Sequence, residues 1–158
     1  MTAKNYLTAA LVAGIAAAAI EMIFVLPIQA SMGNSPGIVF QSIASGTMGK
    51  AAYIGGTPAV LLGIFYHILI SVVAAGAYIA AATRLPFLYS RPLIGGLLCA
   101  IVAYVVMNWV VLPLSAVGYK PTTNPTMMAL SFAIHVIGFG WPIAYVARAM
   151  VRGRDTFK

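Results

Sequence analysis

The fold is decided by residues 59–82, which read AVLLGIFYHILISVVAAGAYIAAA. This stretch contains no Lys, Arg, Asp or Glu, and it is longer than the roughly 20 apolar residues that a helix needs to cross a membrane. Three other apolar runs lie on either side of it, at residues 6–30, 93–117 and 127–146. The sequence therefore predicts an all-α membrane protein built as a bundle of four transmembrane helices.

The composition excludes a soluble globular protein. Of the 158 residues, 62% are hydrophobic and 7% are charged, and the mean hydropathy is +0.99. A soluble domain has about a quarter charged residues. Four membrane helices and their loops use nearly the whole chain, so we predict a single transmembrane domain over residues 1–158. The chain has no phosphate-binding glycine loop, nucleophile elbow or CxxC motif, and we expect no enzymatic activity of its own.

Positive charge is distributed unevenly between the two ends of the predicted helices. The net charge is +7, and most Lys and Arg residues fall at the N-terminus, in the middle loop or at the C-terminus: Lys4, Arg84, Arg91, Arg148, Arg152, Arg154 and Lys158. Only Lys50 and Lys120 fall on the opposite side. Because cytoplasmic loops are enriched in Lys and Arg, both termini are predicted to be cytoplasmic. These cations flank apolar runs instead of forming a basic stripe, so we expect contacts with lipid and no nucleic-acid binding.

The first loop, residues 31–57, is the longest and lies on the non-cytoplasmic side in this topology. Residues 38–44 place apolar side chains at helical spacing, and several glycines follow them. We predict a short interfacial helix across the mouth of the bundle. It would serve either as a cover for the helix ends or as a functional lid.

Small residues recur every three to four positions along residues 6–30. They are Ala9, Ala10, Ala13, Gly14, Ala17 and Ala18. Helices associate in lipid through close packing of small residues. This face is therefore predicted to touch another helix of the bundle.

Polar residues inside the apolar runs mark a candidate site. At about 1.5 Å rise per residue, one polar residue from each helix lies near a common level, about 12 to 14 Å below the non-cytoplasmic face. These residues are Glu21, His67, Asn108 and His135. Ionisable side chains within a membrane are costly and mark functional sites by default. Three residues adjoin this layer in sequence and are candidates for supporting it: Tyr66, Met107 and Trp109.

Prolines interrupt three of the four helices near this layer. Pro27, Pro113 and Pro142 have no backbone N–H, so the carbonyls four residues earlier lose their helical partners. A carbonyl freed at that depth needs a side chain, water or a ligand as its partner.

The polar layer has two interpretations that involve no metal ion. In the first, it is structural: Glu21 bonds a histidine and Asn108 bonds backbone, which would hold the helices in register. In the second, Glu21 and the histidines relay protons towards the outer face. The inner halves of the helices contain few polar groups, so a continuous proton path across the membrane is not expected.

Two further interpretations place a cofactor in the layer. Haem b would use His67 and His135, from diagonal helices, as its axial ligands. Nearby glycines would leave room for its ring: Gly63, Gly138 and Gly140. Alternatively, a transition metal would be held by His67, His135 and Glu21, with Asn108 or Tyr66 orienting an imidazole.

Several short motifs occur together along the chain. They are Gln41-Ser42-Ile43-Ala44-Ser45-Gly46, Gly55-Gly56, Leu62-Gly63, His67, Arg91-Pro92, Met107-Asn108, Pro113-Leu114-Ser115, His135 and Pro142-Ile143-Ala144. In these motifs the chain resembles an uncharacterised family of small bacterial inner-membrane proteins and is distantly similar to YagU-like inner-membrane proteins. The resemblance implies a bacterial inner membrane, four helices and a site built on His67, Asn108 and His135. It implies no activity and no ligand.

The function that we expect is that of an accessory subunit in a larger membrane assembly, such as a respiratory or electron-transfer complex. A chain with almost no mass outside the membrane can act mainly through the sides of its helices. Its expected partners are the lipid bilayer and other membrane subunits or further copies of itself. The alternatives are a haem- or metal-binding protein using His67 and His135, and a small proton-coupled carrier using Glu21.

Overall fold

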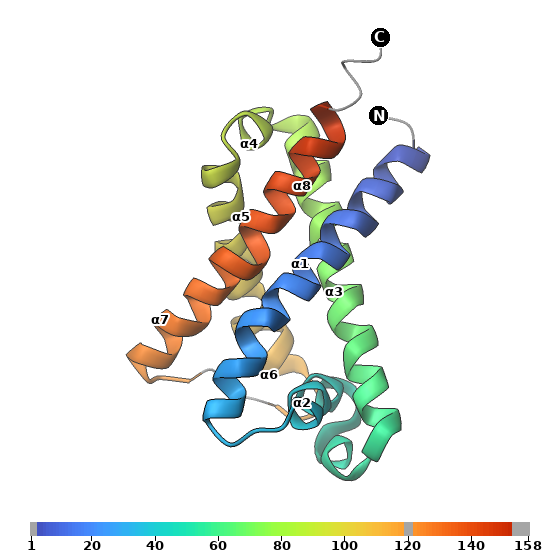
Figure 1. Cartoon of the computed structure of the whole chain (residues 1–158), viewed down its shortest axis with the longest axis vertical. Helices are drawn as coiled ribbons and strands as arrows, with labels where there is room; N and C mark the ends of the chain where they lie inside the picture. The colour runs from blue at the N-terminus through green and yellow to red at the C-terminus, as the bar shows by residue number, and fades with distance from the viewer. Residues whose placement is uncertain (1–2, 119–121, 153–158) are drawn as a thin grey trace.

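The computed structural model describes residues 3–118 and 122–152, which form helices joined by short connections (Figure 1). No strand occurs within these two ranges. Four helices are long and apolar enough to cross a membrane: Asn5–Ser31, Gly56–Arg84, Pro92–Leu114 and Pro125–Met150. The predicted all-α fold with four long apolar helices is confirmed.

Two of these helices are unbroken, and two contain a wider π-helical turn. The unbroken ones are α1 (Ala3–Ser31) and α3 (Gly56–Arg84). The third long helix consists of α5 (Pro92–Val106), the π-turn η2 (Met107–Val111) and α6 (Leu112–Leu114). The fourth consists of α7 (Pro125–Ile134), the π-turn η3 (His135–Gly140) and α8 (Trp141–Arg152).

The observed helix ends differ from the predicted ones by a few residues. The third helix ends at Leu114 and not at residue 117, because Ser115 has an extended backbone with φ −72° and ψ 160°. The third and fourth helices begin at Pro92 and Pro125. Proline suits the first position of a helix, where its missing N–H would have had no partner. The fourth helix also continues to Arg152, beyond the predicted end at residue 146.

The first loop contains the predicted short helix. This helix, α2 (Pro36–Met48), begins after Ser35, whose hydroxyl accepts a hydrogen bond from the Ile38 N–H at 3.3 Å. It leads into a 3-10 turn, η1 (Gly49–Ile54). Against α3, Gly63 lies so close to the Phe40 carbonyl that no side chain fits between them. The contact fixes α2 along the first part of α3.

Small residues bring α1 against α3 and α8, as predicted. The alanines of the predicted face are buried: Ala9, Ala10, Ala13, Ala17 and Ala18. Gly14 lies directly against the backbone of Val72 on α3. On α8, Ile143 and Ala144 are fully buried in the same core.

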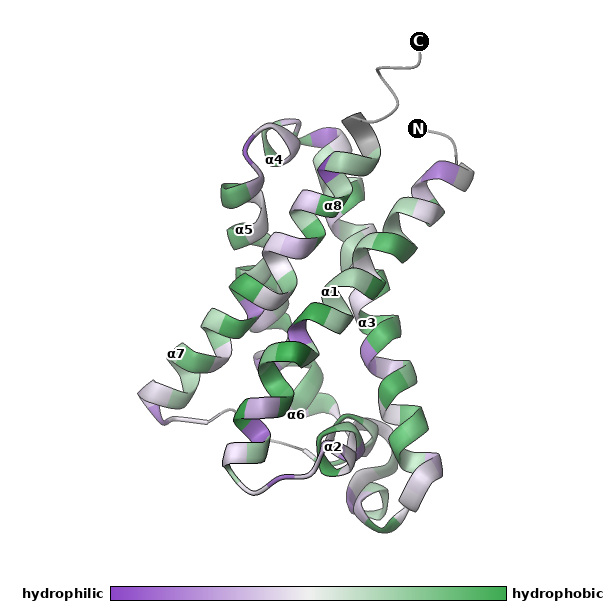
Figure 2. Ribbon diagram, viewed as in Figure 1, coloured by the Kyte–Doolittle hydropathy of each residue, from purple (hydrophilic) through white to green (hydrophobic). Residues whose placement is uncertain are grey.

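The four long helices run alternately up and down. The start of α1, the end of α8 and the short helix α4 (Phe87–Ser90) lie at one end of the molecule, and α2, α6 and the start of α7 lie at the other (Figure 1). Hydrophobic residues extend along the length of these helices (Figure 2). Hydrophilic residues gather mainly at their ends, with a few in the middle of the bundle.

Candidate functional site

Glu21 is a buried carboxylate within α1. Its side chain exposes 10% of its surface, and it is the sole acidic residue in the part of the chain that the structure describes. Ala17 and Ala18 lie one turn earlier on the same side of the helix, so the packed face of α1 turns Glu21 into the bundle. A carboxylate placed there needs polar partners in place of water.

Two imidazoles from other helices flank this carboxylate. The Nε2 atom of His67, on α3, lies 3.9 Å from Glu21 Oε2. The Nδ1 atom of His135, the first residue of η3, lies 3.8 Å from Glu21 Oε1. These distances are longer than hydrogen bonds, so the carboxylate and the two imidazoles are close neighbours without a direct bond. We call Glu21, His67 and His135 the Glu21 cluster; it joins three of the four long helices.

Backbone carbonyls define which ring nitrogen of each histidine is protonated. His67 Nε2 lies 3.1 Å from the Ala18 carbonyl oxygen, and His135 Nδ1 lies 2.8 Å from the Ser131 carbonyl oxygen. A carbonyl oxygen only accepts, so each of these nitrogens is an N–H donor. In the neutral rings, His67 Nδ1 and His135 Nε2 are therefore the atoms open to protonation. Together with the Glu21 carboxylate they provide three proton-accepting positions within the Glu21 cluster.

The two π-turns place residues at the level of the cluster. In η3 the Trp141 N–H reaches the Val136 carbonyl, and in η2 the Leu112 N–H reaches the Met107 carbonyl. Each π-turn is followed by a proline at the second position of the next α-helix. A proline ring clashes with the carbonyl four residues earlier in an α-helix, and a wider turn at that point relieves the clash. The predicted interruption of these two helices thus takes the form of π-turns, which are frequent at functional sites. The interruption predicted at Pro27 is not observed, since α1 continues as α-helix through Pro27 to Ser31.

Gly138 allows η3 to approach α1. It lies one turn after His135 and packs against the backbone of Glu21, with no room for a side chain between them. The following glycine of the turn, Gly140, packs in the same way against the Gly96 carbonyl on α5. The cluster is therefore assembled by helices in backbone contact.

The Asn108 side chain bonds backbone, as the structural interpretation of the layer predicts, and it makes no hydrogen bond with the Glu21 cluster. Its side-chain amide donates to the Tyr104 carbonyl of its own helix at 2.9 Å. The other predicted supporting residues also lie elsewhere. Tyr66 accepts a hydrogen bond from Thr47 on α2 at 3.2 Å, and Trp109 is half exposed. Met107 begins η2 and has no described contact with the cluster.

Tyr104, which was not predicted to belong to the site, packs against His135. Its ring meets the His135 ring edge-on, with the centroids 5.4 Å apart, and its hydroxyl donates to the Met128 carbonyl at 3.4 Å. Tyr104 precedes Asn108 by four residues and shares its helix face. That spacing is the signal that could have identified it.

The geometry does not favour haem between His67 and His135. Glu21 lies between the two imidazoles, and the glycines expected to make room for the ring are in packing contacts with Phe40, Glu21 and Gly96. For a metal ion, the histidine nitrogens that face the carboxylate are N–H donors and offer no lone pair there. Within the described residues, no three His, Cys, Asp or Glu side chains form a group that could hold a metal ion.

Comparison with known proteins returned no relative. The chain matches no protein-family model, no curated protein and no solved structure. The resemblance to YagU-like proteins therefore stays a prediction.

Proposed function

We propose that this chain is a multi-pass protein of the bacterial inner membrane that serves as a non-enzymatic accessory subunit of a larger assembly, such as a respiratory or electron-transfer complex. In support, most of the described residues belong to four long apolar helices, and the largest segment between them holds the short helix α2 and the turn η1. In this proposal both termini are cytoplasmic. Arg84, Arg91 and Arg148 belong to the helix ends beside the start of α1, as the bias of Lys and Arg towards the cytoplasm requires.

The observation that carries the proposal is the exposed side of the third long helix. In its most apolar stretch, 11% of the residues are buried inside the chain, compared with 39% in the first helix. Large apolar side chains are exposed along its whole length, from Leu93 through Val102 to Leu114. We call this surface the third-helix flank. It offers the chain an extended surface for contact with a neighbouring helix in the membrane.

Site-specific photo-crosslinking in native membranes tests the proposal. A photoreactive residue at Val102, on the third-helix flank, is expected to capture one defined membrane polypeptide, which mass spectrometry then identifies. Phe65 on α3 is exposed to a similar extent and is the matched control position, at which lipid adducts alone are expected. Capture of lipid alone at both positions would contradict the proposal. A product of twice the chain's mass would make the neighbour a second copy of the chain.

We propose, as a second candidate, that the Glu21 cluster is the proton-binding site of a small proton-coupled carrier. The specific observation is one carboxylate within 4 Å of two imidazoles that each keep an unprotonated nitrogen. In proteoliposomes with a pH gradient, this function predicts proton flux that Glu21→Gln abolishes and Thr83→Ala, at an exposed position, preserves. Flux that is equal with and without the protein would rule it out.

The cofactor alternatives have a separate test. Elemental analysis and a reduced-minus-oxidised absorbance spectrum of the purified protein would show a metal ion or haem. A signal that disappears in the His67→Ala, His135→Ala double variant would assign it to the Glu21 cluster. A signal that persists in the variant would assign it to a partner protein.

A further inference from the structure

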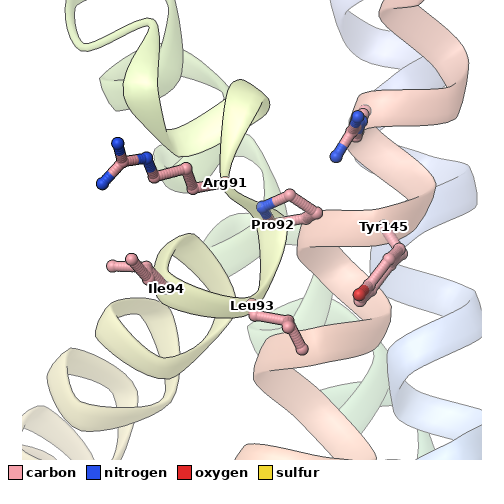
Figure 3. Close-up of a pocket in the computed structure, with 6 residues that line it drawn as sticks. Arg91, Pro92, Leu93, Ile94 and Tyr145 are labelled. Atoms are coloured by element: carbon pink, nitrogen blue, oxygen red, sulfur yellow. The ribbon is translucent and has the colours of Figure 1, made fainter.

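A groove at the proposed cytoplasmic end of the bundle combines positive charge with apolar walls (Figure 3). It lies between the start of α5 and the last turns of α8 and has a volume of about 400 Å³. Its lining residues are Arg91, Pro92, Leu93, Ile94, Tyr145 and Arg148. We call it the arginine groove. Neither the Glu21 cluster nor the third-helix flank accounts for its two arginines.

We propose that the arginine groove binds an anionic phospholipid. Arg148, on the same helix as Tyr145, would bind the lipid phosphate, and Arg91, which points away from Tyr145 (Figure 3), would add positive charge on the other side of the groove. An acyl chain would lie along Leu93 and Ile94. The inference goes beyond the proposed function and rests only on its membrane insertion.

The two arginines of the groove carry positive charge that no described acidic residue neutralises. The Arg91 guanidinium makes no hydrogen bond or ion pair with a described residue. Arg148 donates one long hydrogen bond of 3.4 Å to the Ser90 carbonyl, and its remaining donors are unused within the described residues. The sole acidic side chain in the described ranges, Glu21, faces two histidines on other helices. A guanidinium binds phosphate through paired hydrogen bonds, so these two side chains suit a phosphate ligand.

Exposed apolar side chains lie beside this charge in the arginine groove. Leu93 and Ile94 expose 56% and 45% of their surfaces in the first turn of α5. Tyr145 projects from α8 on the other side, next to Leu93 and Pro92 (Figure 3), and its hydroxyl has no partner among the described residues. Tyrosine is enriched at the level of lipid headgroups, where its ring is apolar and its hydroxyl is hydrated.

Hydrogen bonds hold the walls of the arginine groove in place. The Trp141 indole N–H donates to the Leu93 carbonyl at 3.3 Å and ties α8 to the start of α5. The Tyr78 hydroxyl donates to the Leu88 carbonyl at 2.9 Å and anchors the segment that leads to Arg91. A preformed site loses less conformational entropy when it binds a ligand.

The combination of charge and apolar surface selects a lipid over a soluble anion. Inorganic phosphate would contact only the two arginines and would leave the apolar side chains of Leu93 and Ile94 uncovered. Basic pockets between membrane helices on the cytoplasmic side bind anionic lipid headgroups. A phospholipid with a net negative charge would contact the arginines with its headgroup and the apolar residues with its acyl chain.

Native mass spectrometry of the full-length protein in detergent tests the proposal. Phosphatidylglycerol and phosphatidylcholine share the phosphate and differ in net charge, so the wild-type protein is expected to retain the first and to bind the second about tenfold more weakly. The Arg91→Gln, Arg148→Gln double variant should lose this preference. Arg84→Gln is the matched control, because Arg84 lies at the same end of the bundle and does not line the groove.

Three results would overturn the proposal. The first is equal binding of the two lipids by the wild-type protein. The second is a loss of phosphatidylglycerol binding in the Arg84→Gln control as large as in the double variant. The third is displacement of the lipid by millimolar inorganic phosphate, which would indicate a site for soluble anions. The headgroup comparison uses the wild-type protein, so it holds even if the double variant does not fold. Carbonate extraction of membranes tests insertion separately. A protein released by carbonate would contradict the proposed function and the insertion on which this inference rests, whereas equal binding of the two lipids by an inserted protein would contradict this inference alone.

Discussion

A Cβ atom on Gly138 would lie 2.9 Å from the Cα atom of Glu21. The turn η3 therefore touches α1 at the residue that bears the buried carboxylate. His135 lies three residues before Gly138 in η3, and its Nδ1 lies 3.8 Å from Glu21 Oε1 because the two backbones are this close. The close approach of the helices and the His135 contact are thus a single structural feature.

Gly138→Ala is expected to destabilise the fold by about 1 to 3 kcal/mol, because a side chain there overpacks a contact made with backbone. Unfolding in detergent micelles with increasing SDS measures the change. Gly46→Ala is the matched control: Gly46 lies in α2, and nothing lies within 4 Å of the position of its Cβ atom. The control should be neutral or slightly stabilising, because alanine favours a helix. Equal stability of the two variants would contradict the close contact.

A double-mutant cycle between Glu21→Gln and His135→Phe should give a coupling energy of about 0.6 to 1.7 kcal/mol, as found for polar contacts between membrane helices. The cycle between Glu21→Gln and Asn108→Val should give a coupling within about 0.5 kcal/mol of zero, because separate sites add. The Asn108 amide bonds its own helix. Stronger coupling to Asn108 than to His135 would restore the predicted four-residue layer.

Gly63→Ala should separate α2 from α3, because the added methyl group would collide with the Phe40 carbonyl. Hydrogen exchange measured by mass spectrometry should show faster exchange along Pro36–Met48 and little change in α8. Gly37→Ala is the control in the same short helix, since its nearest neighbour would be in ordinary contact at 3.7 Å. Unchanged exchange in α2 would show that another contact holds it in place.

Labelling with a membrane-impermeant maleimide tests the proposed orientation. In a Cys99→Ser background, Met32→Cys lies at the end of α1 and Ser90→Cys lies at the opposite end of the bundle, and both positions are exposed. Met32→Cys is expected to react in sealed, right-side-out vesicles, and Ser90→Cys only after the membrane is permeabilised. The reverse pattern would place both termini outside the cytoplasm.

The four long helices could be predicted because length and hydropathy are local properties of a sequence. The packed alanine face of α1 follows in the same way from residue spacing. The number of residues from each helix end also predicts a common depth for Glu21, His67 and His135. The structure places the two imidazoles within 4 Å of the carboxylate. The depth of a residue in the bundle can thus be predicted from the sequence where its helix is regular.

The direction in which a side chain points around its helix could not be predicted at the π-turns. Each residue turns an α-helix by about 100°, and a π-turn places one more residue in the turn. Asn108 lies inside η2, so its rotation cannot be derived from helical periodicity alone. Tyr104 precedes η2 in regular α-helix and faces His135. The prolines at positions 113 and 142 indicated an interruption but not its form.

The uneven packing of the fourth helix gives the molecule one rigid end and one compliant end. On the α8 side of η3, Ile143 and Ala144 are fully buried, whereas α7 contributes no buried residue and diverges from α1 (Figure 1). Segments with few buried contacts open first in thermal fluctuations. Excursions of α7 about η3 would therefore expose the His135 ring while the alanine contacts of α1 stay intact. Access to the Glu21 carboxylate would then depend on the local opening of α7 and not on the stability of the whole bundle.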